Sequence, residues 1–214
     1  MSKLFKPPYD IIIYCGGKCG GASLHKTFIF MKEHKPIHIH KDADFKGAQI
    51  LGIHPFEKNN KPKSIFELID KKKKVYIIDS YRNPRDRKIS SYFHNYEHNR
   101  KMFNVPKNIC IEKEVEYYQM YIENNLENYE AISEPLKHYN INIIDMENKG
   151  THWTYEKDNI TFIRLKFEYI KNWNSILSEI MNKKIELRPY NLSNDKEYYQ
   201  YYQLFRKIYY NKFK

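Results

Sequence analysis

The stretch DIIIYCGGKCGGASLHKTF, residues 10–28, joins an apolar strand to a helix through a glycine-rich turn that carries one lysine. Its four glycines, Gly16, Gly17, Gly20 and Gly21, allow the backbone to bend sharply and to approach a ligand closely. The helix that follows starts with backbone N–H groups that lack intrahelical partners, and its dipole favours negative charge there. Lys18 adds a full positive charge. The stretch therefore predicts a site for a phosphate-like anion.

The order of residues in this turn differs from the Walker P-loop, GxxxxGK[ST], in which the lysine and a hydroxyl residue follow the second glycine directly. Here Lys18 precedes Gly20, Cys19 stands next to the lysine, and Ser23 comes five residues after it. The hydroxyl that holds magnesium in the Walker loop is thus displaced. We expect an anion site without a metal ion, and a tight connection with a solvated lysine is the alternative.

Residues 75–95, VYIIDSYRNPRDRKISSYFHN, predict a second strand, turn and helix. The β-branched start favours a buried strand, and Asn83 before Pro84 is typical of a helix cap followed by proline at the first helical position. Three arginines gather around this helix start: Arg82, Arg85 and Arg87. Because the helix dipole disfavours cations there and arginine forks bind phosphate oxygens in pairs, the segment predicts a further contact to an anion.

Together the two segments resemble the sulfotransferases that use 3′-phosphoadenosine 5′-phosphosulfate (PAPS). Those enzymes carry KxGTTxL in a strand-loop-helix near the N-terminus, and the corresponding residues here are Lys18, Cys19, Gly20, Gly21, Ala22, Ser23 and Leu24. They also carry RxPxxRxxS after a later strand, and that motif is complete here as Arg82, Pro84, Arg87 and Ser90. Residues 160–177 are similar to the family's late strand and helix. Gly21 and Ala22 depart from the pattern, since threonines are usual there.

The resemblance implies a PAPS-dependent enzyme that moves a sulfuryl group to an acceptor hydroxyl, on a carbohydrate if the chain is closest to the carbohydrate and capsular-polysaccharide branch. It implies that Lys18 assists catalysis, and that Gly17 and the residues from Lys18 to Leu24 bind the phosphosulfate. Arg82 and Ser90 would bind the 3′-phosphate. No metal ion is implied, and adenine contacts are expected around residues 188–196.

The general base is sought after the first helix, where strand alternation places His38 and His40 on one face. A neutral histidine has a suitable pKa to accept the proton of the acceptor hydroxyl. His40 is the first candidate because it lies nearer the carboxyl end of the strand. His38, His54 and Glu57 are the alternatives, and a structural or solvated role is equally open for each.

Hydrophobic periodicity predicts strands that alternate with helices, and therefore an α/β, P-loop-like fold of three layers in which helices flank a mainly parallel sheet. Strands are expected at residues 11–14, 36–40, 75–78, 141–144 and 161–165, with a turn or hairpin around Gly150. Helices are expected at 22–32, 64–70, from 84, over 112–138 with an interruption, and from about Asn194, which would cap with Glu197. Because ligands bind at the carboxyl ends of parallel strands, Lys18 and Arg82 are expected to face one molecule.

Composition and charge limit the class of protein. The 214 residues can bury a core without disulfides, and we expect one domain over residues 1–214. The three cysteines indicate no disulfide pattern, and Cys15, Cys19 and His25 fall short of a zinc site. Without an apolar leader or membrane span, a soluble cytoplasmic protein is expected, in host cytoplasm if viral. The abundance of Asn, Lys, Ile and Tyr is typical of giant viruses and AT-rich bacteria.

The formal net charge of +11 also fits a basic nucleic-acid-binding module. The lysines are spread along the chain, however, and the one tight run, residues 71–74, is typical of a solvated helix end. Nucleic-acid binding is therefore the less favoured alternative, and a nucleoside-phosphate kinase or other nucleotide-binding protein is the third. The sequence specifies no oligomeric state.

Overall fold

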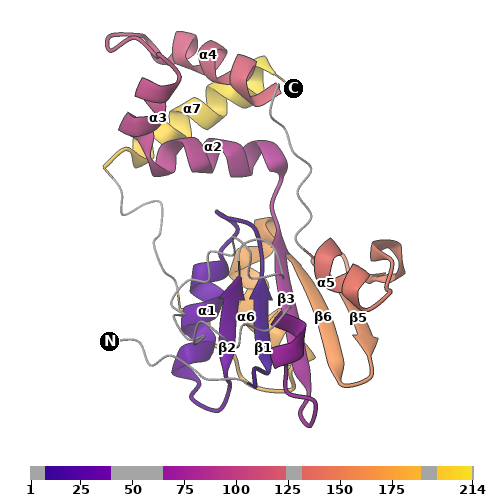
Figure 1. The fold of residues 1–214 in the computed structure, drawn as a ribbon. Coiled ribbons are helices and arrows are strands. Elements are labelled where there is room, and N and C mark those ends of the chain that lie inside the picture. The colour runs from indigo at the N-terminus through magenta and orange to yellow at the C-terminus, as the bar shows by residue number, and fades with distance from the viewer. Residues whose placement is uncertain (1–7, 40–64, 124–131, 189–196, 214) are drawn as a thin grey trace, which may run out of the picture. The chain divides into compact units, whose positions relative to one another are not determined.

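The structure is a computed structural model that describes residues 8–39, 65–123, 132–188 and 197–213. The chain forms two compact units (Figure 1). The sheet unit comprises Met1–Arg82 and Glu130–Tyr190, and the helical unit comprises Asn83–Tyr129 and Asn191–Lys214. Two compact units are compatible with one domain or with two, so the single domain over residues 1–214 stays a prediction.

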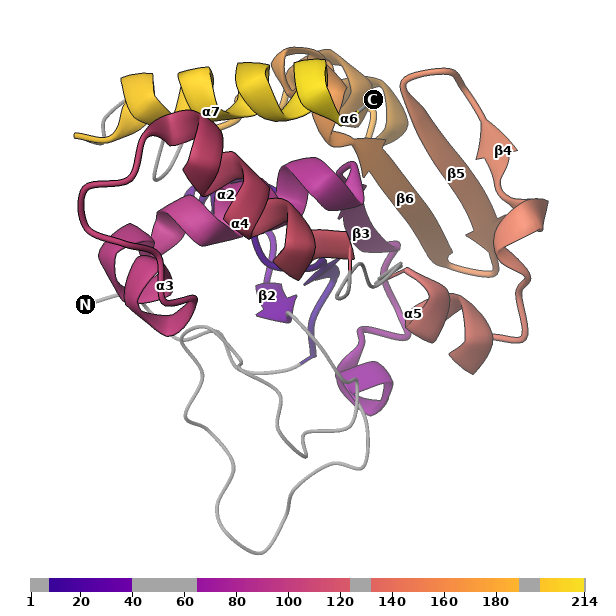
Figure 2. The same ribbon diagram turned by 90° about the horizontal axis from the view of Figure 1, so that it is seen from above.

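The sheet unit is built on a six-stranded mixed sheet that is mostly parallel and flanked by helices, as the α/β prediction requires. Its strand order is β2-β1-β3-β6-β5-β4. The parallel strands are β2 (Pro36–Ile39), β1 (Ile11–Tyr14), β3 (Val75–Tyr81) and β6 (Ile160–Lys166). The strands β5 (His152–Lys157) and β4 (Glu147–Asn148) complete one end of the sheet in antiparallel pairing (Figure 2).

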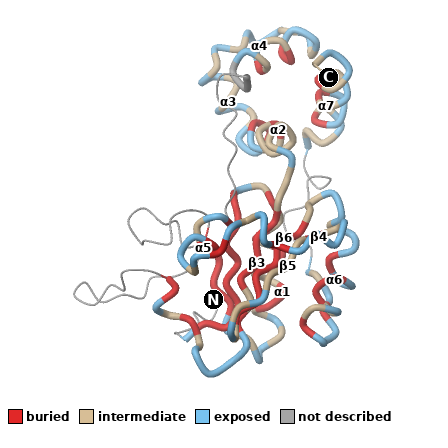
Figure 3. Tube along the Cα trace, turned by 90° about the vertical axis from the view of Figure 1, so that its right-hand side faces the viewer, coloured by how far each residue is buried: buried red, intermediate tan, exposed pale blue. Residues whose placement is uncertain are grey.

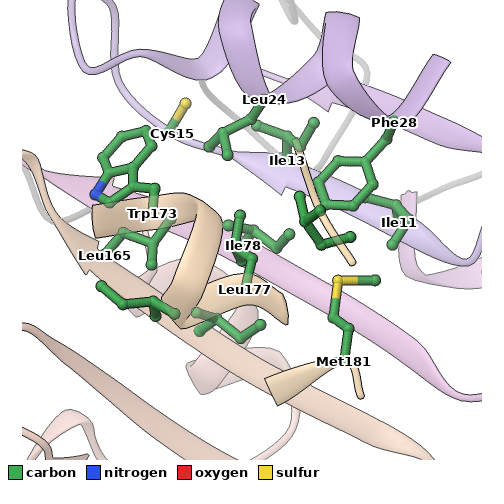
Figure 4. Close-up of a cluster of buried hydrophobic side chains, with 13 residues drawn as sticks. Ile11, Ile13, Cys15, Leu24, Phe28, Ile78, Leu165, Trp173, Leu177 and Met181 are labelled. Atoms are coloured by element: carbon green, nitrogen blue, oxygen red, sulfur yellow. The ribbon is translucent and has the colours of Figure 1, made fainter. Parts of the chain in front are cut away.

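One face of this sheet is covered by α1 (Gly21–Phe30) and α6 (Trp173–Ile180), which pack on β1, β3 and β6. Figure 4 shows the side chains of this core, with Cys15 and Trp173 at one end of the cluster and Met181 at the other. On the opposite face Phe162 meets the ring of Tyr139, which follows α5 (Ser133–His138). The strands of the unit are mostly buried, as Figure 3 shows.

The described part of the sheet unit also contains three short 3-10 helices, and one of them lies where the sequence predicted a strand. These helices are η1 (Ile65–Leu68), η2 (Ile143–Asp145) and η3 (Phe167–Asn172). The strand predicted at residues 141–144 is wrong because η2 occupies that stretch: Asn142 and Asp145 form a reciprocal capping box that nucleates a helical turn. Ile144 is 81% exposed, so the apolar run does not mark a buried strand.

Other predicted boundaries differ by a few residues. The first helix ends at Phe30, and Lys32, which we expected inside it, adopts the left-handed conformation that ends helices. The strand predicted at 36–40 ends at Ile39 within the described residues. The strand predicted at 75–78 continues to Tyr81, which brings two polar residues, Asp79 and Ser80, into the sheet.

The helical unit contains α2 (Pro84–His94), α3 (Tyr96–Met102), α4 (Ile111–Glu123) and α7 (Tyr199–Lys212). The aromatic stripe predicted for the last helix is buried at Tyr202, Phe205 and Tyr209, as expected. That helix begins at Tyr199, and Asn194, its predicted cap, lies outside the described residues. The interruption predicted near residues 124 and 125 falls on residues that the structure does not describe, between α4 and α5.

A buried carboxylate joins these four helices. Glu114 is 1% exposed and accepts hydrogen bonds from the hydroxyls of Tyr92, Tyr96 and Tyr201 at 2.6, 3.1 and 2.8 Å. The guanidinium of Arg100 lies 3.8 Å away. Burial, and then the hydrogen bond to Glu114, raises the pKa of Tyr201 to about 12. Because a buried charge is costly unless it is paired, this cluster holds the helices in one arrangement.

Candidate anion-binding site

The two predicted ligand motifs begin at the same edge of the sheet. Lys18 lies in the turn directly after β1, and Arg82 comes directly after β3. These strands are parallel neighbours, with Ile13 paired to Ile78, so their carboxyl ends lie side by side. The guanidinium of Arg82 donates a hydrogen bond of 2.9 Å to the carbonyl oxygen of Lys18. The structure therefore brings the lysine turn and the first arginine of the second motif together.

Three successive carbonyl oxygens of the turn accept hydrogen bonds from side chains. The thiol of Cys19 donates to the oxygen of Gly17, with 3.6 Å between sulfur and oxygen. Arg82 donates to the oxygen of Lys18, and the Ser80 hydroxyl donates to the oxygen of Cys19. In a trans peptide the N–H points away from the carbonyl of the same unit. Because the three carbonyls point toward these side chains, the N–H groups of the same three peptide units point away from them.

Two residues of the turn have a backbone conformation of the kind that occurs in anion-binding turns. Lys18 has φ of 68° and Gly20 has φ of 84°, both in the left-handed region. Alternation of left-handed and right-handed residues produces a nest of N–H groups that binds anions. A lysine in this conformation is strained, and such strain is kept where the surrounding contacts impose it. Lys18 thus carries both the strained backbone and the positive charge of the site.

The start of α1 is open to an anion. Its cap position is Gly20, and among the described residues no side chain caps this helix and no acidic residue stands in its first turn. A Cβ atom added at Gly17 would meet no atom within 4 Å. The Ser23 N–H donates to the oxygen of Gly20 at 3.0 Å, so the features of this helix start that favour an anion are its positive dipole end and the unfilled space beside Gly17.

Gly21 has a packing role that the sequence analysis did not recognise. A Cβ atom at this position would overlap the Sγ atom of Cys15 and the ring of His38. Only glycine therefore allows the first turn of α1 to lie this close to β1 and β2. A threonine side chain at this position would meet the same two neighbours.

The candidates for a general base have different outcomes. His38 is 1% exposed, and its Nε2 atom lies 3.6 Å from the Sγ atom of Cys15 beneath α1. Burial raises the pKa of the Cys15 thiol well above its usual range, so the pair is a neutral thiol against an enclosed imidazole. The candidates His40, His54 and Glu57 lie outside the described residues. Of the four candidate bases, His38 is therefore the one that lies within the described residues, and it is buried in the core.

The second motif continues into the helical unit. Ser90 lies on α2 and is partly exposed. The predicted cap is confirmed, since the side chain of Asn83 accepts hydrogen bonds from the N–H groups of Arg85 and Asp86. The sequence analysis missed a contact here: Arg206 of α7 forms an ion pair of 2.7 Å with Asp86. The first turn of α2 therefore contains a carboxylate that is paired with a cation from another helix of the same unit.

Ser80 was also missed by the sequence analysis. It follows Asp79 at the end of a buried strand, where a polar residue at a strand exit is a possible signal of a site. Asp79 itself is 2% exposed and lies 3.5 Å from the guanidinium of Arg164 on the neighbouring strand. The buried carboxylate is thus paired with a buried cation, as burial of charge requires.

Metal binding and membrane insertion find no support in the described residues. Within them, no group of three His, Cys, Asp or Glu side chains is arranged to hold a metal ion, and none of Cys15, Cys19 and Cys110 forms a disulfide. Over the same residues, none of the helices has the length and apolar character needed to cross a membrane.

No protein-family model, curated protein or solved structure matches this chain.

Proposed function

We propose that this chain is a PAPS-dependent sulfotransferase that transfers a sulfuryl group to an acceptor hydroxyl, on a carbohydrate, and that its sheet unit has a P-loop-like, three-layer fold. The observation that carries the proposal is the turn of Lys18. It combines two left-handed residues, a helix start without a side-chain cap among the described residues and a lysine with the first arginine of RxPxxRxxS at the same sheet edge. The complete second motif favours PAPS over other phosphate-like anions as the ligand.

The residues present fit such a ligand. The phosphosulfate carries negative charge, and the turn offers N–H groups and Lys18 where the backbone at Gly17 is open. The guanidinium of Arg82, which would bind the 3′-phosphate, lies beside this turn, where it donates a hydrogen bond to the oxygen of Lys18. Ser23, which the resemblance assigns to the cradle, stands in the first turn of α1, where it is 6% exposed and its N–H donates to the oxygen of Gly20.

When bound, PAPS supplies the sulfuryl group: a new S–O bond forms to the acceptor oxygen as the S–O bond to the 5′-phosphate breaks. Lys18 would neutralise the charge that develops on the departing phosphate oxygen. Loss of such an electrostatic contact costs about 100- to 1000-fold in rate. The acceptor's proton must pass to a base, for which His40 stays our prediction. Arg82 and Ser90 would bind the 3′-phosphate.

Binding of adenosine 3′,5′-bisphosphate, the second product, tests this proposal. We expect the bisphosphate at 100 times its Kd to raise the melting temperature by about 5 to 10 °C. ATP with magnesium should give a smaller shift, since the turn lacks the Walker order of lysine and hydroxyl. Single-stranded DNA is the third probe. Larger stabilisation by ATP with magnesium or by DNA would favour the kinase or nucleic-acid alternative.

Sulfate transfer to a panel of carbohydrates separates catalysis from binding. We expect Lys18→Ala to abolish transfer of labelled sulfate while retaining part of the bisphosphate affinity, and Arg82→Ala to lose that affinity. Lys35→Ala is the matched control, because it removes one exposed lysine of the same unit outside the turn. Failure of millimolar bisphosphate to stabilise the wild-type protein would remove the sulfotransferase proposal.

A further inference from the structure

Two aromatic side chains from one segment, Phe167 and Trp173, lie against Gly20 of the lysine turn. Trp173, the first residue of α6, is fully buried. A Cβ atom at Gly20 would lie 3.0 Å from two atoms of the Trp173 ring and 3.5 Å from the ring of Phe167. The indole is itself held, because its Nε1 donates a hydrogen bond of 3.1 Å to the oxygen of Lys166. A fixed ring plane thus supports the left-handed residue of the turn.

Phe167 also positions Arg82. The guanidinium carbon of Arg82 lies 4.4 Å from the centre of the Phe167 ring, which is the geometry of a cation–π contact. Stacking on a ring restricts a long side chain that would otherwise sample many rotamers. The same guanidinium holds the Lys18 carbonyl. Phe167 therefore acts on the turn in two ways, through Gly20 and through Arg82.

We propose that Phe167 and Trp173 are positioning residues that hold the Lys18 turn in its anion-binding conformation. We call them the aromatic brace. Neither ring needs to touch the ligand, because their effect passes through Gly20 and Arg82. The brace rests on the proposed function only in requiring that the turn binds an anion. Because the brace already holds the turn in one conformation, the turn loses less conformational entropy when an anion binds. This smaller entropic cost raises the affinity.

The test compares Trp173→Phe with a control of similar packing loss. Phe162→Leu is suitable because Phe162 is fully buried in the same unit and its ring contacts are to Tyr139 and Tyr155. Isothermal titration with adenosine 3′,5′-bisphosphate and with inorganic pyrophosphate gives Kd for each variant, and melting temperatures give stability. We expect Trp173→Phe to weaken binding about tenfold while Phe162→Leu stays within about twofold of wild type.

A double-mutant cycle tests the contact with Gly20 directly. Gly20→Ala places a methyl group against the Trp173 ring and strains a left-handed residue, so it should weaken binding. If the ring holds Gly20, the losses in Gly20→Ala and Trp173→Phe should be less than additive in the double variant, because the smaller ring relieves the overlap. Additive losses would contradict a direct contact between the two.

The outcomes separate the brace from the sulfotransferase proposal. If pyrophosphate binds, Trp173→Phe weakens it and the bisphosphate does not bind, the brace stands and the sulfotransferase proposal falls. Equal affinity in Trp173→Phe and Phe162→Leu at matched stability would overturn the brace even if the bisphosphate binds. Binding of neither probe by wild-type protein would overturn both. Phe167→Leu gives a second measurement if Trp173→Phe fails to fold.

Discussion

The two helices that carry the predicted ligand motifs begin differently. The start of α1 has glycine at the cap position, and among the described residues no side chain caps it and no acid occupies its first turn. The start of α2 is capped by Asn83 and contains Asp86, which pairs with Arg206. The N–H groups of Arg85 and Asp86 in α2 thus bond to the side chain of Asn83, whereas α1 has no side-chain cap from the described residues and its Ser23 N–H donates to the backbone oxygen of Gly20. We therefore expect the start of α1, and not that of α2, to be the principal anion site.

The largest expected effect comes from the packing that creates the open start of α1. Gly21→Ala should destabilise the sheet unit by about 1–3 kcal/mol, because the added methyl group overlaps Cys15 and His38. Gly17→Ala is the control, since a Cβ there meets no atom within 4 Å, and we expect a change below about 1 kcal/mol. Urea unfolding measures both. Equal losses would show that the close approach of α1 to the strands is not what requires glycine.

The capped start of α2 predicts a smaller loss. Asn83→Ala should cost about 1 kcal/mol, because the N–H groups of Arg85 and Asp86 lose their acceptor. Asn95→Ala is matched to it, since Asn95 stands at the cap position of α3 without a side-chain cap hydrogen bond. We expect that variant to unfold at nearly the wild-type urea concentration. If Asn95→Ala lost as much stability as Asn83→Ala, the loss would reflect the replacement of asparagine by alanine and not the removal of a cap.

A substitution with the smallest expected effect on stability gives the clearest test of the difference between the two helix starts. In this variant stability and anion binding should change in opposite directions. Ala22→Asp places a carboxylate in the first turn of α1, where the helix dipole should stabilise it by about 0.3–1 kcal/mol. The same charge should weaken pyrophosphate binding about tenfold by repulsion. Ala22→Asn, of similar size but neutral, should keep most of the affinity. Parallel changes in stability and affinity in Ala22→Asp would argue against anion binding at this helix start.

The sequence predicted best those features that neighbouring residues set. The strand Ile11–Tyr14 and the Asn83 cap before Pro84 were predicted correctly, because β-branched runs and cap residues act on the backbone next to them. The stretch 141–144 shows the limit of hydrophobic pattern. Its isoleucines suggested a strand, and the capping box of Asn142 and Asp145 gave a helical turn instead.

The glycine turn, its lysine, the strands that lead into both motifs and the expectation that the motifs meet all follow from local sequence patterns. How the turn is held follows only from the folded chain. Ser80 and Arg82 reach the carbonyls of Cys19 and Lys18 across 61 and 64 residues of sequence, and Trp173 reaches Gly20 from a different segment. No local pattern encodes such contacts, because they exist only once parallel pairing has aligned the carboxyl ends of the strands.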